Sequence, residues 1–304
     1  MISIPFTCER AASTHATQVL LAAPPFNFLW KPKTILKWSE DLTELDQLKI
    51  DEVTRRAAWR NAAALWDFTL REIQLITREV KREGVFAFGG DAVKRQEFEE
   101  LLTDGESRND IYDQGLEALE AWKNADPAWS YSDDVVSAGF GSLLAASLAQ
   151  KQTHLIKEKA WKRAANRLLF KARKVDADNV AWYAAASRKF KKGTEGGDLL
   201  RSNVPTTTRP EPAVGQGQIS HVMVQGNTVH FDFNAEHATH FAVLHREPGS
   251  PVLLIVVADT TEKSVTFQDL APGVHHFAVI PSNSGGEGAQ SVAVPVQVSQ
   301  QAAA

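Results

Sequence analysis

The spacing of apolar residues changes once along the chain, from a seven-residue repeat to a two-residue alternation. In the first part, Trp59, Trp66, Ile73 and Val80 recur every seven residues. Apolar residues at this spacing lie along one side of an α-helix and predict a buried seam. After about residue 217, apolar and polar residues alternate, which is typical of strands with one buried face. The sequence therefore predicts a helical region followed by a separate β region.

Four main helices are predicted in the first part of the chain. They cover about residues 39–83, 106–124, 132–174 and 176–192. The apolar stripe of the third helix drifts near His154, so a break at that point is an alternative. Helices of this number, two of them long, predict an antiparallel four-helix bundle of the up-and-down kind.

The last part of the chain is predicted to form roughly seven short strands. Val222 and Val224 alternate with polar neighbours in the first strand, and Phe231 and Phe233 do so in the second. Further stretches of this kind follow, each bounded by Gly, Pro, Asn or Asp. This arrangement is typical of an antiparallel β-sandwich.

The segment "SVTFQDLAPGVHHFAVIPSNSGGEG" resembles the last strands of a fibronectin type III domain. In that family a Leu-x-Pro-Gly turn precedes an alternating strand, which is followed by Asn, a Gly-containing turn and the final strand. The matching residues are Leu270, Pro272, Gly273, Phe277, Val279, Asn283 and Gly288. Two positions depart from the family: Phe233 stands in place of its tryptophan, and His275 or His276 in place of its corner tyrosine. The resemblance implies a β-sandwich but no activity, because this fold serves many functions.

The predicted fold class is α+β multidomain: an N-terminal antiparallel α-helical (four-helix) bundle followed by a fibronectin type III-like β-sandwich. The helical part is similar to helical domains of uncharacterised bacterial proteins that also end in such a sandwich. The predicted domains are an irregular N-terminal arm over 1–38, the bundle over 39–192, a linker over 193–216 and the sandwich over 217–300.

The composition is typical of a globular protein, with 43% hydrophobic and 23% charged residues. A net charge of −4 argues against a surface built throughout for nucleic acid. Cys8 is the single cysteine, so the chain forms no internal disulfide, which fits a reducing compartment. We find no secretory leader and no apolar run of membrane-spanning length. The expected location is the cytoplasm, with export by a non-classical route or incorporation in a particle as the alternative.

Two residue groups were weighed as chemical sites. His237 and His240 are three residues apart beside Glu236, but they fall in an expected loop with no fixed third ligand, so solvated histidines are favoured over a metal site. Cys8 and His15 lie in the expected irregular arm and lack the orienting group that a nucleophile and its base need. We therefore expect no catalytic, cofactor or metal site.

Two stretches carry opposite charge. Residues 97–120 hold nine carboxylates against Arg108, and residues 151–174 hold nine bases against Glu158. One interpretation is that the two stretches lie side by side in the bundle and favour one topology. The other is a basic surface that contacts an acidic protein or nucleic-acid phosphates. The residues expected in such a surface are Lys157, Lys162, Arg163, Arg167, Lys171 and Lys174.

Aromatic residues within the basic stretch bear on its partner. Trp161 and Phe170 are assigned to the buried seam of the helix. The basic surface then lacks aromatic side chains on which bases stack, so sequence-specific reading of nucleic acid is not expected.

The predicted function is that of a non-enzymatic structural or protein-interaction protein. The helical bundle would self-associate or dock protein partners, and the sandwich would project as an interaction module. One alternative is non-specific binding of nucleic acid or another polyanion through residues 151–174. A further alternative is an enzyme with its site in the cleft between the domains, using carboxylates such as Asp133 and Asp134.

Overall fold

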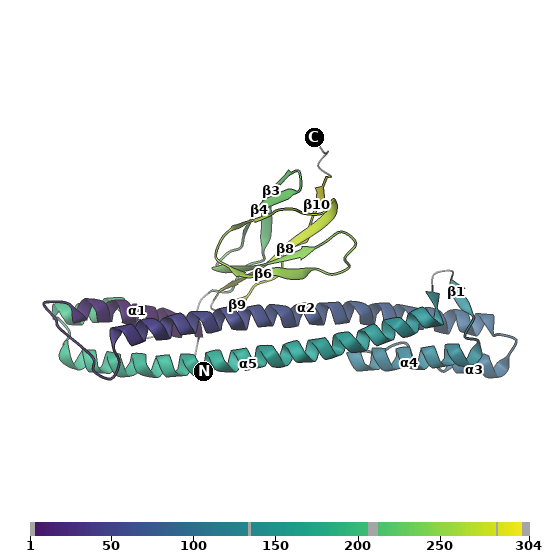
Figure 1. Ribbon diagram of the computed structural model, residues 1–304, viewed down its shortest axis with the longest axis horizontal. Coiled ribbons are helices and arrows are strands. Elements are labelled where there is room, and N and C mark those ends of the chain that lie inside the picture. Colours follow the sequence, from purple (N-terminus) through teal and green to yellow (C-terminus); the bar gives the residue numbers. More distant parts are fainter. Residues whose placement is uncertain (1–3, 133–134, 206–211, 284, 300–304) are drawn as a thin grey trace. The chain divides into compact units, whose positions relative to one another are not determined.

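A computed structural model describes residues 4–132, 135–205, 212–283 and 285–299 (Figure 1). These residues form six helices and ten strands. The chain divides into two compact units. The first unit comprises Met1–Ala57, Lys159–Pro248 and Ile255–Ala304, and the second comprises Ala58–Glu158 and Gly249–Leu254.

Two long helices pass through both units. They are α2 (Ile35–Ala87) and α5 (Ser137–Lys189), each of 53 residues. The sequence analysis divided the second of these into two helices, with an alternative break near His154, and this division is wrong. Residues 142–192 contain no glycine or proline, so the chain has no residue there that favours a break. A four-helix bundle is therefore not confirmed.

The two long helices are antiparallel and lie side by side (Figure 1). Three contacts join them: Lys171 Nζ to Asp41 Oδ1 at 2.7 Å, Trp161 Nε1 to Glu52 Oε1 at 2.7 Å, and Trp66 Nε1 to Ser147 Oγ at 3.2 Å. The first two contacts lie in the first unit and the third in the second unit. In the second unit the ring of Trp59 also lies beside that of His154, with centroids 6.1 Å apart. In each unit, later residues of α2 therefore contact earlier residues of α5, so the two helices are antiparallel.

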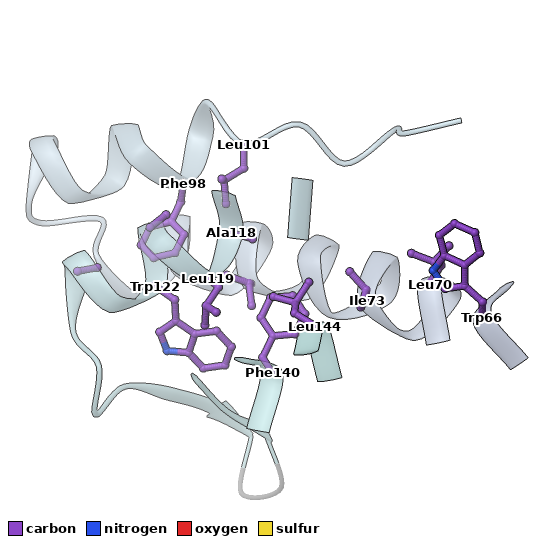
Figure 2. Close-up of a cluster of buried hydrophobic side chains, with 13 residues drawn as sticks. Trp66, Leu70, Ile73, Phe98, Leu101, Ala118, Leu119, Trp122, Phe140 and Leu144 are labelled. Atoms are coloured by element: carbon purple, nitrogen blue, oxygen red, sulfur yellow. The ribbon is translucent and has the colours of Figure 1, made fainter. Parts of the chain in front are cut away.

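In the second unit, shorter elements cover the long helices. They are α3 (Ala92–Glu99), α4 (Arg108–Ala125), β1 (Ser130–Ser132) and β2 (Val135–Val136). Ser107 caps α4 with a reciprocal capping box to Asp110. The core contains the predicted seam residues Trp66 and Ile73, and Figure 2 shows Trp122 of α4 close to Phe140 of α5, with ring centroids 6.3 Å apart. These contacts confirm that the seven-residue repeat marks a buried seam.

In the first unit, α1 (Ile4–Ala22) lies where the sequence analysis expected an irregular arm over 1–38. The buried side of α1 consists of Thr7, Ala11, Thr14, Thr17, Gln18 and Leu21. Most of these side chains are polar or small, so the apolar periodicity that marks a helix is weak. A further helix, α6 (Glu195–Asn203), falls inside the expected linker and is capped by Thr194.

The C-terminal part is an antiparallel β-sandwich. Its strands are β3 (Gln218–Gln225), β4 (Thr228–Asn234), β5 (His240–Arg246), β6 (Leu254–Thr260), β7 (Ser264–Phe267), β8 (Gly273–Asn283), β9 (Gly286–Glu287) and β10 (Val294–Val298). One sheet has the order β3-β4-β7, and the other has the order β10-β8-β5-β6, with β9 paired to β8. The two sheets share a core that includes Phe231, Phe233, Phe241 and Phe277.

The first strand of the sandwich departs from the expected alternation. Phe231 and Phe233 of β4 are buried, whereas Val222 and Val224 of β3 are 37% and 44% exposed. A β-bulge between Ser220 and Met223 shifts the register of β3 against β4. Val222 lies within this bulge and so falls outside the alternation. Val224 pairs with the buried Val229 but lies near the end of the strand, where it stays partly exposed.

The structure also decides which histidine stands at the corner of the sandwich. His275 is 1% exposed, and its Nε2 donates to the carbonyl oxygen of Ala271 at 2.7 Å. This is the hydrogen bond back to the upstream backbone that a corner tyrosine makes in related sandwiches. His275, rather than His276, therefore takes the corner position.

Candidate functional site

One side of α5 is buried and the opposite side carries bases. Ala164, Leu168, Lys171, Ala172 and Val175 are buried. The opposite side, within the first unit, exposes the residues that we call the basic stripe: Lys159, Arg163, Arg167, Phe170 and Lys174. Their spacing of four, four, three and four residues places them along one face of the helix.

Phe170 is the apolar member of the basic stripe, and its side chain is 75% exposed. Arg167 precedes it by three residues and Lys174 follows it by four, so both are its neighbours on the helix surface. The sequence analysis assigned Phe170 to the buried seam, and this assignment is wrong. In the unbroken helix, the buried row through Leu168 and Ala172 leaves position 170 on the opposite side.

The charges of the basic stripe are not neutralised within the described chain. The side chains of Lys159, Arg163, Arg167 and Lys174 make no ion pair or hydrogen bond with any described residue. Like charges four residues apart on a helix repel one another. An anionic surface would remove this repulsion, so the stripe is suited to an acidic partner.

Three of the six bases expected from the sequence, Arg163, Arg167 and Lys174, lie on the basic stripe. Lys157 and Lys162 are exposed on α5 but lie outside the stripe. Lys171 is buried and bonded to α2, so it is not available to a partner. Phe170 and Lys159 were not among the residues expected in the basic surface, and the phase of the buried side of α5 is the signal that locates them.

Lys171 belongs to a buried charge cluster in the first unit. Its Nζ contacts Asp41 at 2.7 Å and also Glu44, while Lys33 Nζ contacts Asp41 at 2.6 Å and Asp178 at 2.8 Å. Burial by itself disfavours each charge, but hydrogen bonds outweigh it, so the pKa of Asp41 is lowered and that of Lys171 is raised. Every charge in the cluster has a partner, and we interpret it as structural.

The acidic and basic stretches contact each other at Lys151, whose Nζ donates to Asn109 Oδ1 at 2.8 Å. Among the described residues, no ion pair joins 97–120 to 151–174. Instead Arg108 of the acidic stretch pairs with Asp67 of α2 at 2.6 Å. The prediction that the two stretches lie side by side is therefore supported at this one contact, while most of their charges are not paired with each other.

The other candidate residues do not come together. His237 Nε2 lies 3.2 Å from Glu236, whereas His240 contacts Thr239. Nowhere in the described parts of the chain do three or more His, Cys, Asp or Glu residues group as metal ligands do. Asp133 and Asp134 lie outside the described residues.

Cys8 and His15 are both on α1, seven residues apart, which is about 10 Å along a helix and too far for a hydrogen bond. Cys8 packs against the cluster formed by Leu45, Leu168 and Ala172. Burial raises the pKa of the Cys8 thiol, which makes it a poorer nucleophile.

No family model and no curated protein matches the chain. The C-terminal part is similar to solved structures that contain fibronectin type III domains. The twitchin kinase region from C. elegans is 15% identical over 29% of this chain and 17% of that chain, with a TM-score of 0.26. The chicken CNTN1 FN1-FN3 domains are 16% identical over 28% of this chain and 32% of that chain, with a TM-score of 0.24. The fourth FNIII domain of a human protein is 18% identical over 33% of this chain and 91% of that chain, with a TM-score of 0.27. The chain thus spans less than a third of the length of the first two.

At these identities and TM-scores the evidence for the fold is the strand order and the His275 corner. On that evidence the C-terminal part is a fibronectin type III-like β-sandwich. Across the described residues, no helix has the length and apolar character needed to cross a membrane.

Proposed function

We propose that the protein is a non-enzymatic docking protein whose helical region binds an acidic protein surface through the basic stripe. The observation that carries this proposal is the run of exposed bases without ion pairs on both sides of the exposed Phe170. In this proposal the sandwich is a second interaction module on the same chain.

The chemistry of the basic stripe favours a protein partner. Arginine and aromatic side chains are enriched where protein interfaces hold most of their binding energy. Burying Phe170 under a partner contributes about 2 kcal/mol by the hydrophobic effect. The positive charges of Arg163 and Arg167 attract an acidic surface and orient it, which raises the rate of association. Salt screens this attraction and lowers the rate.

A direct test uses immobilised poly-L-glutamate as the acidic polypeptide. We expect the protein to bind at low salt and to be released at high salt. The double variant Arg163→Glu/Arg167→Glu should bind at least about tenfold more weakly. Lys191→Glu/Lys192→Glu makes the same charge change at exposed residues beyond the end of α5 and is the matched control. Equal binding by the stripe variant and the control would contradict the proposal.

Polyanion binding is a second candidate function, and the exposure of Phe170 favours it. Bases of single-stranded nucleic acid stack on aromatic side chains, and this is worth about 1–3 kcal/mol per base. Fluorescence anisotropy with an oligothymidylate separates the two candidates. Nucleic-acid binding predicts that Phe170→Ala weakens the oligonucleotide complex far more than the polyglutamate complex. Docking of a protein predicts polyglutamate binding that an oligonucleotide does not match.

A further inference from the structure

A second charged surface of the chain is the outer side of α4. It exposes Asp113, Leu116, Glu117 and Glu120, which we call the acidic face. Their spacing of three or four residues puts them on one side of the helix. The three carboxylates make no ion pair or hydrogen bond with any described residue. Leu116 between them is 42% exposed.

The acidic face and the basic stripe are opposite in charge. Asp113 to Glu120 spans about 10 Å along the helix axis and Lys159 to Lys174 about 22 Å, so the acidic face covers about half of the stripe. Each surface also contains one exposed apolar side chain, Leu116 or Phe170. The two surfaces lie in different units, and among the described residues no ion pair joins them, so each is free to contact another molecule.

The net charge of the chain permits close approach of two copies. The net charge is only −4 over 304 residues, so the electrostatic repulsion between two whole copies is weak. Whether two copies associate then depends on the local attraction between surfaces of opposite charge. Nucleic acid would use the basic stripe alone and would leave the acidic face without a partner. A second copy of this chain satisfies both surfaces.

We infer that the basic stripe of one copy binds the acidic face of a second copy. This inference rests on the proposed function and names the acidic partner. Because the two surfaces differ, the contact is heterologous, and the assembly keeps a free basic stripe at one end and a free acidic face at the other. Association of this kind continues into a ring or a filament instead of stopping at a symmetric dimer.

The test is a charge swap followed by sedimentation velocity. At low salt, about 0.05 M, we expect the wild-type mass to rise above the 33.4 kDa of one chain with increasing concentration. Arg163→Glu/Arg167→Glu and Glu117→Lys/Glu120→Lys should each stay at 33.4 kDa. The first variant cancels the positive charge of the basic stripe and the second reverses the charge of the acidic face, so copies of one variant no longer attract each other. An equal mixture of the two variants should assemble again, because the unaltered basic stripe of the second binds the unaltered acidic face of the first.

Matched controls change the same charges elsewhere. Lys191→Glu/Lys192→Glu and Asp259→Lys/Glu262→Lys alter exposed residues outside both surfaces and should assemble like the wild type. Circular dichroism shows whether each variant keeps the helical and strand content of the wild type. A variant that does not fold is replaced by the neutral pair Arg163→Gln/Arg167→Gln or Glu117→Gln/Glu120→Gln, which should weaken assembly to a smaller degree.

Two results would overturn the inference. One is a wild-type protein that stays at 33.4 kDa at low salt at every attainable concentration. The other is an acidic-face variant that assembles as well as the wild type. If the basic-stripe variant still loses polyglutamate binding in either case, the docking proposal stands and only the identity of the partner is rejected. If the basic-stripe variant changes neither assembly nor polyglutamate binding, both proposals fail.

Discussion

The sandwich and the helices of the first unit bury polar groups in different ways. In the sandwich, His275 Nε2 donates to the Ala271 carbonyl oxygen, so its Nδ1 is free to accept from His245 Nε2 at 2.8 Å. The ring of His245 also stacks on Phe277, with centroids 4.7 Å apart. The two imidazoles therefore satisfy each other within an otherwise apolar core.

In the helices of the first unit, several buried polar atoms have no side-chain or backbone partner among the described residues. They are Arg10 Nε, Thr14 Oγ1, Gln18 Oε1, Trp38 Nε1, Trp182 Nε1 and both amide atoms of Asn179. The same region holds the buried charges of Lys33, Asp41 and Lys171. An unsatisfied buried polar group costs about 1–3 kcal/mol. In the described part of the sandwich, His276 Nδ1 is the one buried side-chain polar atom without such a partner, so we expect burial to stabilise the helices of the first unit less than the sandwich.

The two regions can be followed separately. All eight tryptophans precede residue 193, so tryptophan fluorescence reports on the helices and not on the sandwich. Hydrogen exchange of the β8 amides reports on the sandwich. We expect the fluorescence transition to occur at a lower denaturant concentration than the loss of protection in β8.

The largest expected effect comes from breaking the charge cluster. Asp41→Asn leaves the buried ammonium groups of Lys33 and Lys171 without their shared carboxylate. We expect a loss of about 3 kcal/mol in the free energy of unfolding of the helices, measured by fluorescence in urea. Asp259→Asn, at an exposed position, is the control and should change little. An equally small effect at Asp41 would show that the cluster adds no stability.

A smaller loss is expected at the corner of the sandwich. His275→Phe keeps a ring beside Phe277 but removes the donor to Ala271 and the acceptor for His245. We expect a loss of about 2 kcal/mol, measured by hydrogen exchange in β8, with the fluorescence transition unchanged. A shift of the fluorescence transition by the same amount would mean that the two regions unfold as one.

Acid should weaken the sandwich through His245. Burial, together with the neighbouring His275, lowers the pKa of His245 below its ordinary value of 6.5. The unfolded chain therefore binds a proton at a higher pH than the folded chain does. The contribution of His245 to the free energy of unfolding of the sandwich is fully present above pH 6.5. It is lost as the pH falls from 6.5 through the lowered pKa of the folded state. His245→Phe should flatten this dependence, and an unchanged pH profile would assign it to other groups.

The smallest effect is expected where a buried polar group makes no hydrogen bond with the described residues. Asn179→Leu removes an amide whose two polar atoms have no partner among the described residues, so we expect stability to be unchanged or to rise by up to about 1 kcal/mol. Asn283→Leu is the matched change in the sandwich, where Nδ2 donates to Pro212 at 2.9 Å and to His237 at 3.1 Å. A clear loss is expected only at Asn283. A comparable loss at Asn179 would remove the contrast between the two regions.

Local patterns predicted the strands better than the helices. The alternation around Phe231 and Phe233 is read directly from neighbouring residues, and both are buried as predicted. The bulge in β3 removed Val222 from the expected alternation, because an inserted residue leaves no apolar signal. The buried side of α1 was missed for another reason, because most of its side chains are polar or small.

The candidate site was predicted in part. The positions of Arg163, Arg167 and Lys174 on an exposed helix side follow from charge alone. The burial of Lys171 and the exposure of Phe170 do not, because they depend on the phase of one uninterrupted helix. That phase is fixed by packing against α2, as at Asp41, and this contact is far away in the sequence.

The bulge in β3 has a consequence for how the protein withstands aggregation. β3 is an outer strand that contains neither lysine nor proline, and it exposes Val222, Met223 and Val224 in a row. A straight strand of this composition would be a template for amyloid-like stacking. The bulge bends the strand and twists its free edge, and His221 occupies the left-handed conformation there. We therefore expect the bulge to hinder the pairing of this edge with other copies of the strand.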